Sequence, residues 1–185
     1  MIKVFTGAMF SGKSTALVDT YMNIWNKKSC KCYTPIKDTR SGSVLKSRNI
    51  KEGIPAKGIC DLSEIVEDFS PETRTIFIDE AQFLTGDVKW LVRLSTEHDI
   101  DIYIAGLNMT SEQDPFGIMP QILAIADEVQ ICKAVCFDCN KPASYSFCLE
   151  DKEDEVLVGN DEYVPLCGKC LVKRRVVIGG KWNNE

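Results

Sequence analysis

The stretch Gly7-x4-Gly12-Lys13-Ser14 has the pattern of a phosphate-binding loop. The backbone N–H groups of such a loop point inward, while its lysine and hydroxyl reach the β- and γ-phosphates and Mg²⁺. An apolar stretch precedes the motif and a helix-like stretch follows it, so a chance glycine-rich turn is the weaker interpretation. We expect a nucleoside triphosphate and Mg²⁺ to contact Gly7, Ala8, Met9, Phe10, Ser11, Gly12, Lys13, Ser14 and Thr15.

A second group, Asp79-Glu80-Ala81-Gln82, follows the apolar run 75–78. The carboxyl ends of parallel strands face the ligand crevice, so both carboxylates are expected near the phosphates. Asp79 would hold Mg²⁺ through water, and Glu80 could act as general base toward an attacking hydroxyl. We expect Gln82 to contact the nucleotide and Mg²⁺ as well. The alternative is that the two acidic residues only cap the next helix.

A third group consists of two Cys-x2-Cys pairs, Cys136/Cys139 and Cys167/Cys170. Four thiolates at this spacing are suited to a closed, structural, tetrahedral zinc site, with free buried cysteines as the alternative. Metal binding would supply folding energy that a small C-terminal unit lacks. The stretch 156–163 lies between the pairs and is interpreted as a lid over a flat substrate or as an ordinary hairpin. The other five cysteines show no ligand spacing and are expected in the core.

The elements that must position these groups follow from the hydrophobic pattern. We expect strands at 2–6, 30–34, 75–78, 100–105 and 129–135, and helices from the loop to about residue 28, at 61–69, at 87–98 and at 118–126. Residues 36–58 have weak periodicity and are expected to form a long connection. Alternating helices and continuous apolar strands predict an α/β fold, a P-loop (RecA-like) parallel sheet with helices on both faces. We place this domain at 1–132 and a zinc-binding domain at 133–185.

Composition excludes several classes of protein. Hydrophobic residues make up 44% of the chain, enough for a core, and the net charge of −5 argues against a protein that coats nucleic acid. No stretch has the length of a membrane span or the core of a signal peptide, so the sequence indicates a cytoplasmic protein. A single histidine, His98, argues against histidine-based catalysis and is expected at the end of a helix.

In their order along the chain, these motifs resemble the type II thymidine kinases. The resemblance includes the loop at 7–14, Asp38-Thr39-Arg40, the run 78–83, Gly106-Leu107, Pro115-Phe116-Gly117, both cysteine pairs and the run 159–163. It implies transfer of the γ-phosphoryl group of ATP to the 5′-hydroxyl of thymidine, with deoxyuridine as a plausible second substrate. Zinc would be structural, dTTP an inhibitor, and the assembly a homotetramer without membrane or nucleic-acid partners.

The resemblance also implies roles for individual residues. Glu80 would be the catalytic base, assisted by Lys13, and Arg40 would stabilise charge at the transferred group. The backbone of a lasso loop would read the edge of the base. The implied thymidine contacts are Met9, Phe83, Leu107, Phe116, the segment Tyr145-Ser146, Val156, Leu157, Val158, Gly159 and Tyr163. Asn108 and Ser111 stand where the family usually has Asp and Phe, and we expect these changes to affect affinity and pyrimidine selectivity.

Two other functions are compatible with parts of the pattern. Asp-Glu-Ala-Gln resembles helicase motifs, so a nucleic-acid-stimulated P-loop ATPase with a zinc ribbon is the main alternative. A single domain lacks the second motor lobe of such enzymes, and the negative charge gives little electrostatic footprint for nucleic acid. A non-catalytic zinc-ribbon binding module would leave Lys13 and Glu80 unexplained. The leading hypothesis is therefore a deoxynucleoside kinase.

Overall fold

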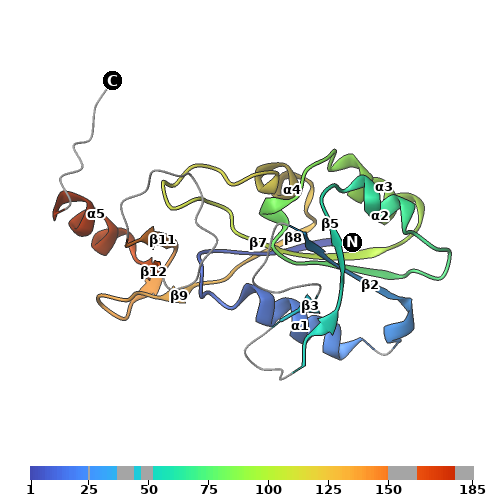
Figure 1. The fold of residues 1–185 in the computed structure, drawn as a ribbon, viewed down its shortest axis with the longest axis horizontal. Coiled ribbons are helices and arrows are strands. Elements are labelled where there is room, and N and C mark those ends of the chain that lie inside the picture. Colours follow the sequence, from blue (N-terminus) through green and yellow to red (C-terminus); the bar gives the residue numbers. More distant parts are fainter. Residues whose placement is uncertain (25, 37–43, 47–51, 150–161, 178–185) are drawn as a thin grey trace.

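The computed structural model of the chain describes residues 1–24, 26–36, 44–46, 52–149 and 162–177. A larger α/β unit carries the N-terminus, and a smaller unit formed by the C-terminal strands and the last helix lies to one side of it (Figure 1). Among the described residues, no helix combines the length and the apolar character that a bilayer crossing requires.

The larger unit is built on a six-stranded parallel sheet with the strand order β5-β2-β6-β7-β1-β8. All four residues of β6 are buried, because both faces of the sheet are covered. The predicted parallel α/β fold is therefore confirmed. The strands are β1 (Ile2–Thr6), β2 (Cys30–Pro35), β5 (Lys57–Ile59), β6 (Thr75–Ile78), β7 (Asp101–Gly106) and β8 (Glu128–Ile131).

Helices and a short hairpin cover the two faces of this sheet (Figure 1). One core joins the sheet to α1 (Lys13–Asn23) and to the hairpin of β3 (Val44–Leu45) and β4 (Ile54–Pro55). The other core joins it to α2 (Ser63–Glu67), α3 (Lys89–Glu97) and α4 (Met119–Ile125). Side chains alternate along a strand, so Phe77 of β6 belongs to the first core while Ile76 and Ile78 belong to the second. Short 3₁₀ turns, η1 (Lys27–Ser29) and η2 (Ala81–Phe83), follow α1 and β6.

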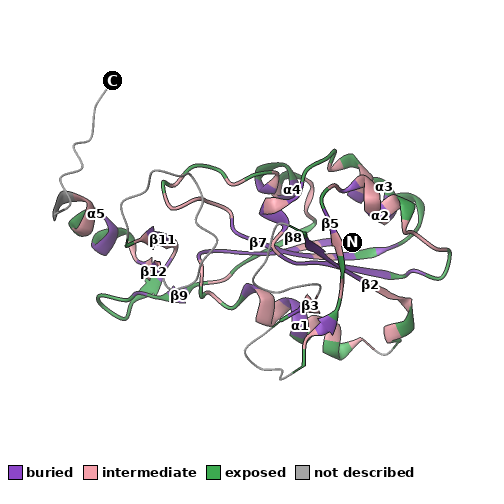
Figure 2. Cartoon of the chain, in the orientation of Figure 1, coloured by how far each residue is buried: buried purple, intermediate pink, exposed green. Residues whose placement is uncertain are grey.

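The smaller unit has two antiparallel strand pairs and one helix. The pairs are β9 (Ala134–Val135) with β10 (Pro142–Ala143), and β11 (Tyr145–Cys148) with β12 (Tyr163–Leu166), followed by α5 (Gly168–Val177). Among the described residues, its buried cluster has eight members, two of which are Cys136 and Cys170. Burial is concentrated in the strands of the larger unit (Figure 2). So small a core needs an additional constraint.

The structure confirms most predicted elements and corrects three. Helix α1 ends at Asn23 instead of near residue 28, because Ile24 takes an extended backbone and Lys27 Nζ donates to the last-turn carbonyl of Tyr21. The predicted connection 36–58 contains β3, β4 and the edge strand β5, whose Lys-Gly-Ile sequence lacks an apolar run. The predicted strand 129–135 is two strands, and Cys132 N donates the last bond to β1 at Thr6 O.

The structure confirms the predicted helix end at His98, but not the predicted place of every cysteine. His98 ends α3, as expected, and Asp61 Oδ1 accepts from Ser63 N (2.9 Å) at the start of α2. Of the five cysteines expected in the core, Cys32 is buried there, and Cys30 and Cys132 are half-buried and pack against the same core. Cys148 is half-buried in β11. The expectation is wrong for Cys60, which is exposed because it lies in the turn between β5 and α2.

Candidate active site

Three connections leave the carboxyl edge of the central sheet next to one another. The phosphate-binding loop follows β1, the Asp79-Glu80 pair follows β6, and the loop 107–118 follows β7, which lies between those two strands. This edge is where parallel α/β sheets bind their ligands. The sheet topology thus brings together residues that are separated by up to 110 positions in the sequence.

The loop 7–12 is built to approach an anion closely. Gly7 has a φ of 141°, and a Cβ atom there would lie 2.1 Å from the carbonyl oxygen of Cys132, so only glycine fits. The Lys13 side chain is buried, and its Nζ donates to Ala8 O (2.8 Å). This hydrogen bond holds the lysine side chain against the loop. Ser11 Oγ is buried without a hydrogen-bond partner in the described part of the chain. A phosphate oxygen would satisfy such a hydroxyl, so the loop fits a nucleotide phosphate.

Asp79 is buried and bonded to the start of α1. Its Oδ1 accepts from Ser14 Oγ (3.1 Å) and from the backbone N of Glu80 (2.9 Å). Burial, and then the neighbouring Glu80, raise the pKa of Asp79 to about 7, although both hydrogen bonds and Lys13 act in the opposite direction. A divalent cation beside this carboxylate would favour its ionised form. A carboxylate and a hydroxyl are oxygen ligands of the kind Mg²⁺ prefers, so Asp79 and Ser14 fit that ion.

Glu80 has a left-handed backbone conformation, with φ 51° and ψ 38°. This region is uncommon for a residue with a Cβ atom, and such strain is concentrated at functional sites. The side chain is half-buried, and Glu80 Oε2 accepts from Gln82 Nε2 (2.5 Å). The alternative is that the two acidic residues only cap the next helix. Glu80 does precede η2, but its side chain makes no capping hydrogen bond there, so capping does not account for this carboxylate.

An aromatic pair lies beside these carboxylates. The rings of Phe83 in η2 and Phe116 in the loop 107–118 are 5.4 Å apart in an edge-to-face arrangement with an interplanar angle of 82°. Both side chains are half-buried, and Leu107 at the start of the same loop is buried. Flat apolar surfaces of this kind suit an aromatic ligand. The structure thus brings together three of the residues that were predicted to contact the substrate.

The smaller unit contacts the phosphate-binding loop directly. Ser146 of β11 is buried, and its Oγ accepts from the backbone N of Met9 (2.9 Å). Tyr163 of β12 is also buried, and it pairs with Cys148 in the β11–β12 ladder. The hydrogen bond joins residues 137 positions apart, and no pattern in the sequence signals it. The predicted substrate residues Met9 and Ser146 are therefore neighbours.

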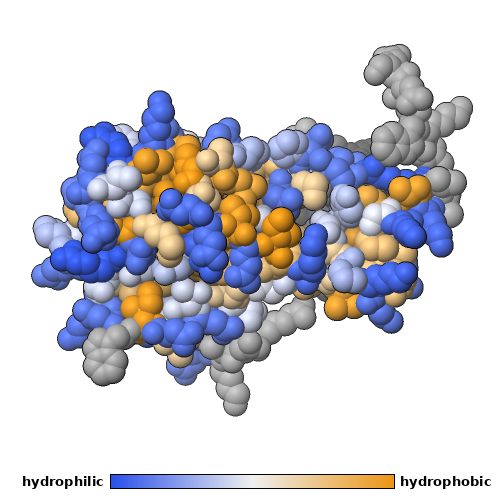
Figure 3. All heavy atoms as spheres, turned by 180° about the vertical axis from the view of Figure 1, so that it is seen from behind, coloured by the Kyte–Doolittle hydropathy of each residue, from blue (hydrophilic) through white to orange (hydrophobic). Residues whose placement is uncertain are grey.

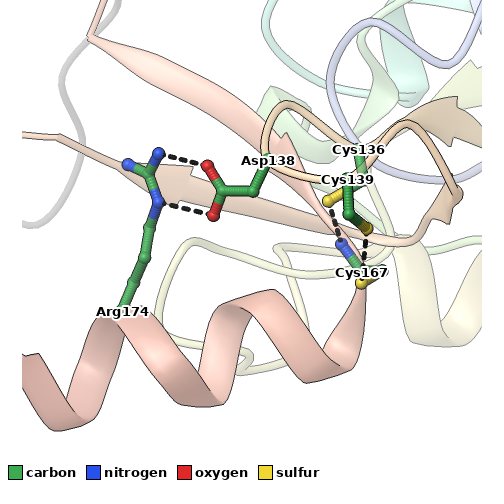
Figure 4. Close-up of polar contacts among 5 residues, drawn as sticks. All are labelled: Cys136, Asp138, Cys139, Cys167 and Arg174. Carbon is green, nitrogen blue, oxygen red and sulfur yellow. Dashed lines mark hydrogen bonds and ion pairs between the residues drawn. The ribbon is translucent and has the colours of Figure 1, made fainter.

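The four paired cysteines form one cluster in the smaller unit. Figure 4 shows three of them, Cys136, Cys139 and Cys167. Cys136 and Cys139 lie in the turn between β9 and β10, and Cys167 and Cys170 lie at the start of α5. Their sulfur atoms all lie within 4.8 Å of one another, and Cys139 Sγ is 3.6 Å from Cys167 Sγ. In a tetrahedral site with zinc–sulfur bonds of about 2.3 Å, sulfur atoms are about 3.8 Å apart. The cluster thus has the size of a four-thiolate metal site.

Backbone donors and an ion pair support this cluster. Cys136 is buried, which opposes ionisation, but N–H groups led by that of Cys167 (3.2 Å) lower the pKa of the Cys136 thiol to about 6. Arg174 of α5 holds Asp138 with two hydrogen bonds, Nε to Oδ2 (2.9 Å) and Nη2 to Oδ1 (2.5 Å) (Figure 4). Both interactions tie α5 to the turn that carries the first cysteine pair.

Some predicted site residues lie outside the described residues. These are Arg40, Val156, Leu157, Val158 and Gly159, and their roles stay predictions. Of the other loop residues, Phe10 is exposed, Gly12 precedes α1, and Thr15 is half-buried in the first turn of α1. Asn108 and Ser111 lie in the loop 107–118, where Asn108 O accepts from Phe116 N (3.2 Å).

Comparison with known proteins identifies the family. Residues 1–171 match the family model described as "Thymidine kinase". The chain is 34% identical over 182 residues to the thymidine kinase of Bacteroides thetaiotaomicron, covering 97% of this chain and 91% of that protein. It is 36% identical over 177 residues to the thymidine kinase of Vaccinia virus (strain Ankara), covering 92% of this chain and 96% of that protein. The thymidine kinase of Pseudothermotoga lettingae is 29% identical over 177 residues, covering 93% of this chain and 95% of that protein. The resemblance seen in the sequence is confirmed: the chain belongs to the thymidine kinase family.

Proposed function

We propose that this chain transfers the γ-phosphoryl group of ATP to the 5′-hydroxyl of thymidine, and that deoxyuridine is a second acceptor. The observation that carries the proposal is the sheet edge at which the loop 7–14, the Asp79–Ser14 pair and Glu80 meet beside the Phe83–Phe116 pair. Such a site has the parts that phosphoryl transfer needs: a phosphate cradle, a metal-binding carboxylate, a base and a surface for the acceptor. The family comparisons give no support to the ATPase alternative.

The phosphates of ATP would be held by the loop N–H groups, Lys13 and Ser11, while Ser14 and Asp79 would hold Mg²⁺. Two features support this assignment: the Ser11 hydroxyl has no hydrogen-bond partner among the described residues, and the backbone approaches closely at Gly7. When bound, Mg²⁺ neutralises charge on the phosphate oxygens. Thr15, in the first turn of α1, would lie next to the same phosphates.

The transfer itself requires one bond to form and one to break. The 5′-oxygen of thymidine attacks the γ-phosphorus, Glu80 accepts the hydroxyl proton, and the bond from the γ-phosphorus to the bridging oxygen breaks to leave ADP. Lys13 stabilises the charge that develops on the phosphoryl oxygens. The place of Glu80, directly after the metal-binding carboxylate, supports its role as base. Arg40 remains a predicted charge stabiliser.

Thymine would lie between the aromatic pair and the smaller unit. Phe83 and Phe116 offer apolar surface for the ring, and Met9, Leu107 and Ser146 would surround its methyl group. Tyr163 and the backbone of 156–159 would complete the pocket as a lasso. The Met9–Ser146 hydrogen bond supports this arrangement, because it joins the smaller unit to the nucleotide loop.

We propose that zinc occupies the cysteine cluster in a structural role. Four thiols of matching size, with N–H donors that favour the ionised Cys136, are typical of zinc. All four tetrahedral positions would be filled by protein, so no site remains for a substrate or a reacting water molecule. Zinc would then hold β9–β12 and α5 together beside the active site.

A phosphate-transfer assay tests the proposed function. The protein is incubated with γ-labelled ATP and Mg²⁺ and, separately, with thymidine, deoxyuridine, deoxycytidine, deoxyadenosine or deoxyguanosine. We expect labelled thymidine monophosphate as the main product and a smaller yield from deoxyuridine. Release of labelled phosphate that DNA or RNA stimulates, with no labelled nucleotide, would instead support the ATPase alternative.

We also propose a homotetramer, as the family resemblance implies. Hydrophobic side chains gather on the back of the larger unit (Figure 3). In the edge strand β8, Val129 and Ile131 are 42% and 62% exposed. An exposed apolar edge strand is a common site of chain association. Inhibition by dTTP and a cytoplasmic location stay predictions.

Light scattering on the purified protein tests this assembly. The wild-type mass should be four times the chain mass of 20.7 kDa. Ile131→Lys should reduce it, because a charge cannot be buried cheaply at an apolar interface. Val172→Lys, at an exposed position of α5, is the matched control and should not change the mass. A monomeric wild type would contradict the tetramer, and an unchanged Ile131→Lys mass would contradict a role of β8.

A further inference from the structure

Gln82 lies at the centre of the site, and both ends of its side-chain amide are engaged. The residue is 3% exposed, in η2 directly after the two carboxylates. Its Nε2 donates to Glu80 Oε2 (2.5 Å), and its Oε1 accepts from the backbone N of Leu107 (2.9 Å). One buried side chain therefore links the proposed base to the loop that follows β7.

Chemistry alone determines which way this amide points. The backbone N–H of Leu107 can only donate, so the amide oxygen of Gln82 must face it, and the NH₂ group must then face the carboxylate of Glu80. Flipping the amide would replace both hydrogen bonds with repulsive contacts. Since unsatisfied buried polar groups are costly, the arrangement is held at both ends.

Two glycines leave room for Gln82 on either side of the loop. A Cβ atom at Gly106 would lie 3.1 Å from Gln82 Oε1 and 2.5 Å from the sulfur of Met119. Gly117 has a φ of 52°, and a Cβ atom there would lie 2.1 Å from the Gln82 carbonyl oxygen. The glycines of the motifs Gly106-Leu107 and Pro115-Phe116-Gly117, at the two ends of the loop, thus both avoid a close contact with Gln82 that a Cβ atom would make. They allow the loop to close around Gln82.

We propose that Gln82 is a positioning residue that orients the carboxylate of Glu80 and couples it to the substrate-facing loop at Leu107. The inference rests on the proposed function of Glu80 as base. It adds a role to the nucleotide and Mg²⁺ contact that the sequence predicted for Gln82. That contact stays a prediction, because the two hydrogen bonds use only one N–H and one lone pair of the amide. Leu107 and Phe116 would contact thymine, so movement of their loop would be transmitted through Gln82 to the carboxylate of Glu80.

Two substitutions separate the two hydrogen bonds. Gln82→Met keeps the length of the side chain and removes both bonds. Gln82→Glu keeps an acceptor for Leu107 N but replaces the neutral amide donor with a second carboxyl group, which competes with Glu80 for a proton. We expect both to lower kcat by about 10- to 100-fold, as misplacement of a reacting group does, and to leave KM for ATP unchanged. Only Gln82→Met should raise KM for thymidine. Gln121→Met, at an exposed site of α4, is the matched control.

A double-mutant cycle with Glu80→Gln decides between positioning and a merely structural role. If Gln82 acts through Glu80, Gln82→Met should change kcat less than about 2-fold once the carboxylate is gone. Losses that multiply, or an unchanged kcat in both single Gln82 variants, would overturn the inference. Loss of ATP binding in both folded variants would do so too, because it would indicate general disruption. An unchanged kcat in Glu80→Gln alone would count against the proposed function.

Discussion

Glu80→Gln should lower kcat by about 10²- to 10⁴-fold, the contribution that a positioned general base makes. The substitution removes the charge and the basicity of the side chain but keeps its shape. A glutamine at this position still offers an oxygen to Gln82 Nε2, so the hydrogen bond between residues 80 and 82 can persist. Affinity for ATP should stay within about 2-fold, because the phosphate loop and Asp79 are unchanged. Steady-state kinetics and displacement of a fluorescent ATP analogue measure the two quantities.

The control for this variant is Glu72→Gln, which makes the same chemical change at an exposed position. It should have wild-type kcat and KM. A Glu80→Gln enzyme with kcat within about 3-fold of wild type would contradict the assignment of Glu80 as base. Parallel loss of ATP binding would show that the variant disrupts the nucleotide site, and it too would contradict a role confined to the proton.

Removal of the metal should disorder the smaller unit and abolish thymidine phosphorylation. The buried cluster of that unit is small, and two of its members are themselves cluster cysteines, so hydrophobic burial alone holds it weakly. A structural zinc contributes an apparent free energy of about 10–16 kcal/mol in small domains. Without it, β11 would no longer hold Ser146 against Met9 N. The larger unit should stay folded, because its two cores do not include the cluster.

Chelation followed by hydrogen exchange tests this expectation. One zinc ion per chain should be released, protection should fall in 134–148 and 163–177, and it should persist in β1, β6 and β7. Cys139→Ser should reproduce the effect, while Cys60→Ser, at an exposed cysteine outside the cluster, should not. Retained protection in the metal-free protein would contradict a structural role. Loss of protection over the whole chain would contradict the predicted division into domains at 1–132 and 133–185.

The parts of the site that the sequence predicts best are those set by neighbouring residues. The phosphate loop, the Asp79-Glu80 pair and the two cysteine pairs are each defined by residue types at short, fixed spacing. The strands before the phosphate loop and before the Asp79-Glu80 pair are also predictable from neighbouring residues. A strand buried on both faces is a continuous hydrophobic run. The edge strand β5 is not predicted, since its Lys-Gly-Ile sequence offers one buried apolar side chain, Ile59, instead of a run.

Contacts between distant positions were decided by the tertiary structure alone. The order of strands sets β7 between β1 and β6, and this places Leu107 N beside Gln82. The packing of the smaller unit against the phosphate-binding loop places Ser146 of β11 beside Met9 N. Each of these hydrogen bonds depends on a direction of the backbone, which no residue type encodes by itself. The sequence by itself therefore determined which chemical groups are present and the family they indicate. The packing of the sheet and the smaller unit decided which of those groups hold one another in place, because hydrogen bonds act only over the short distances that folding creates.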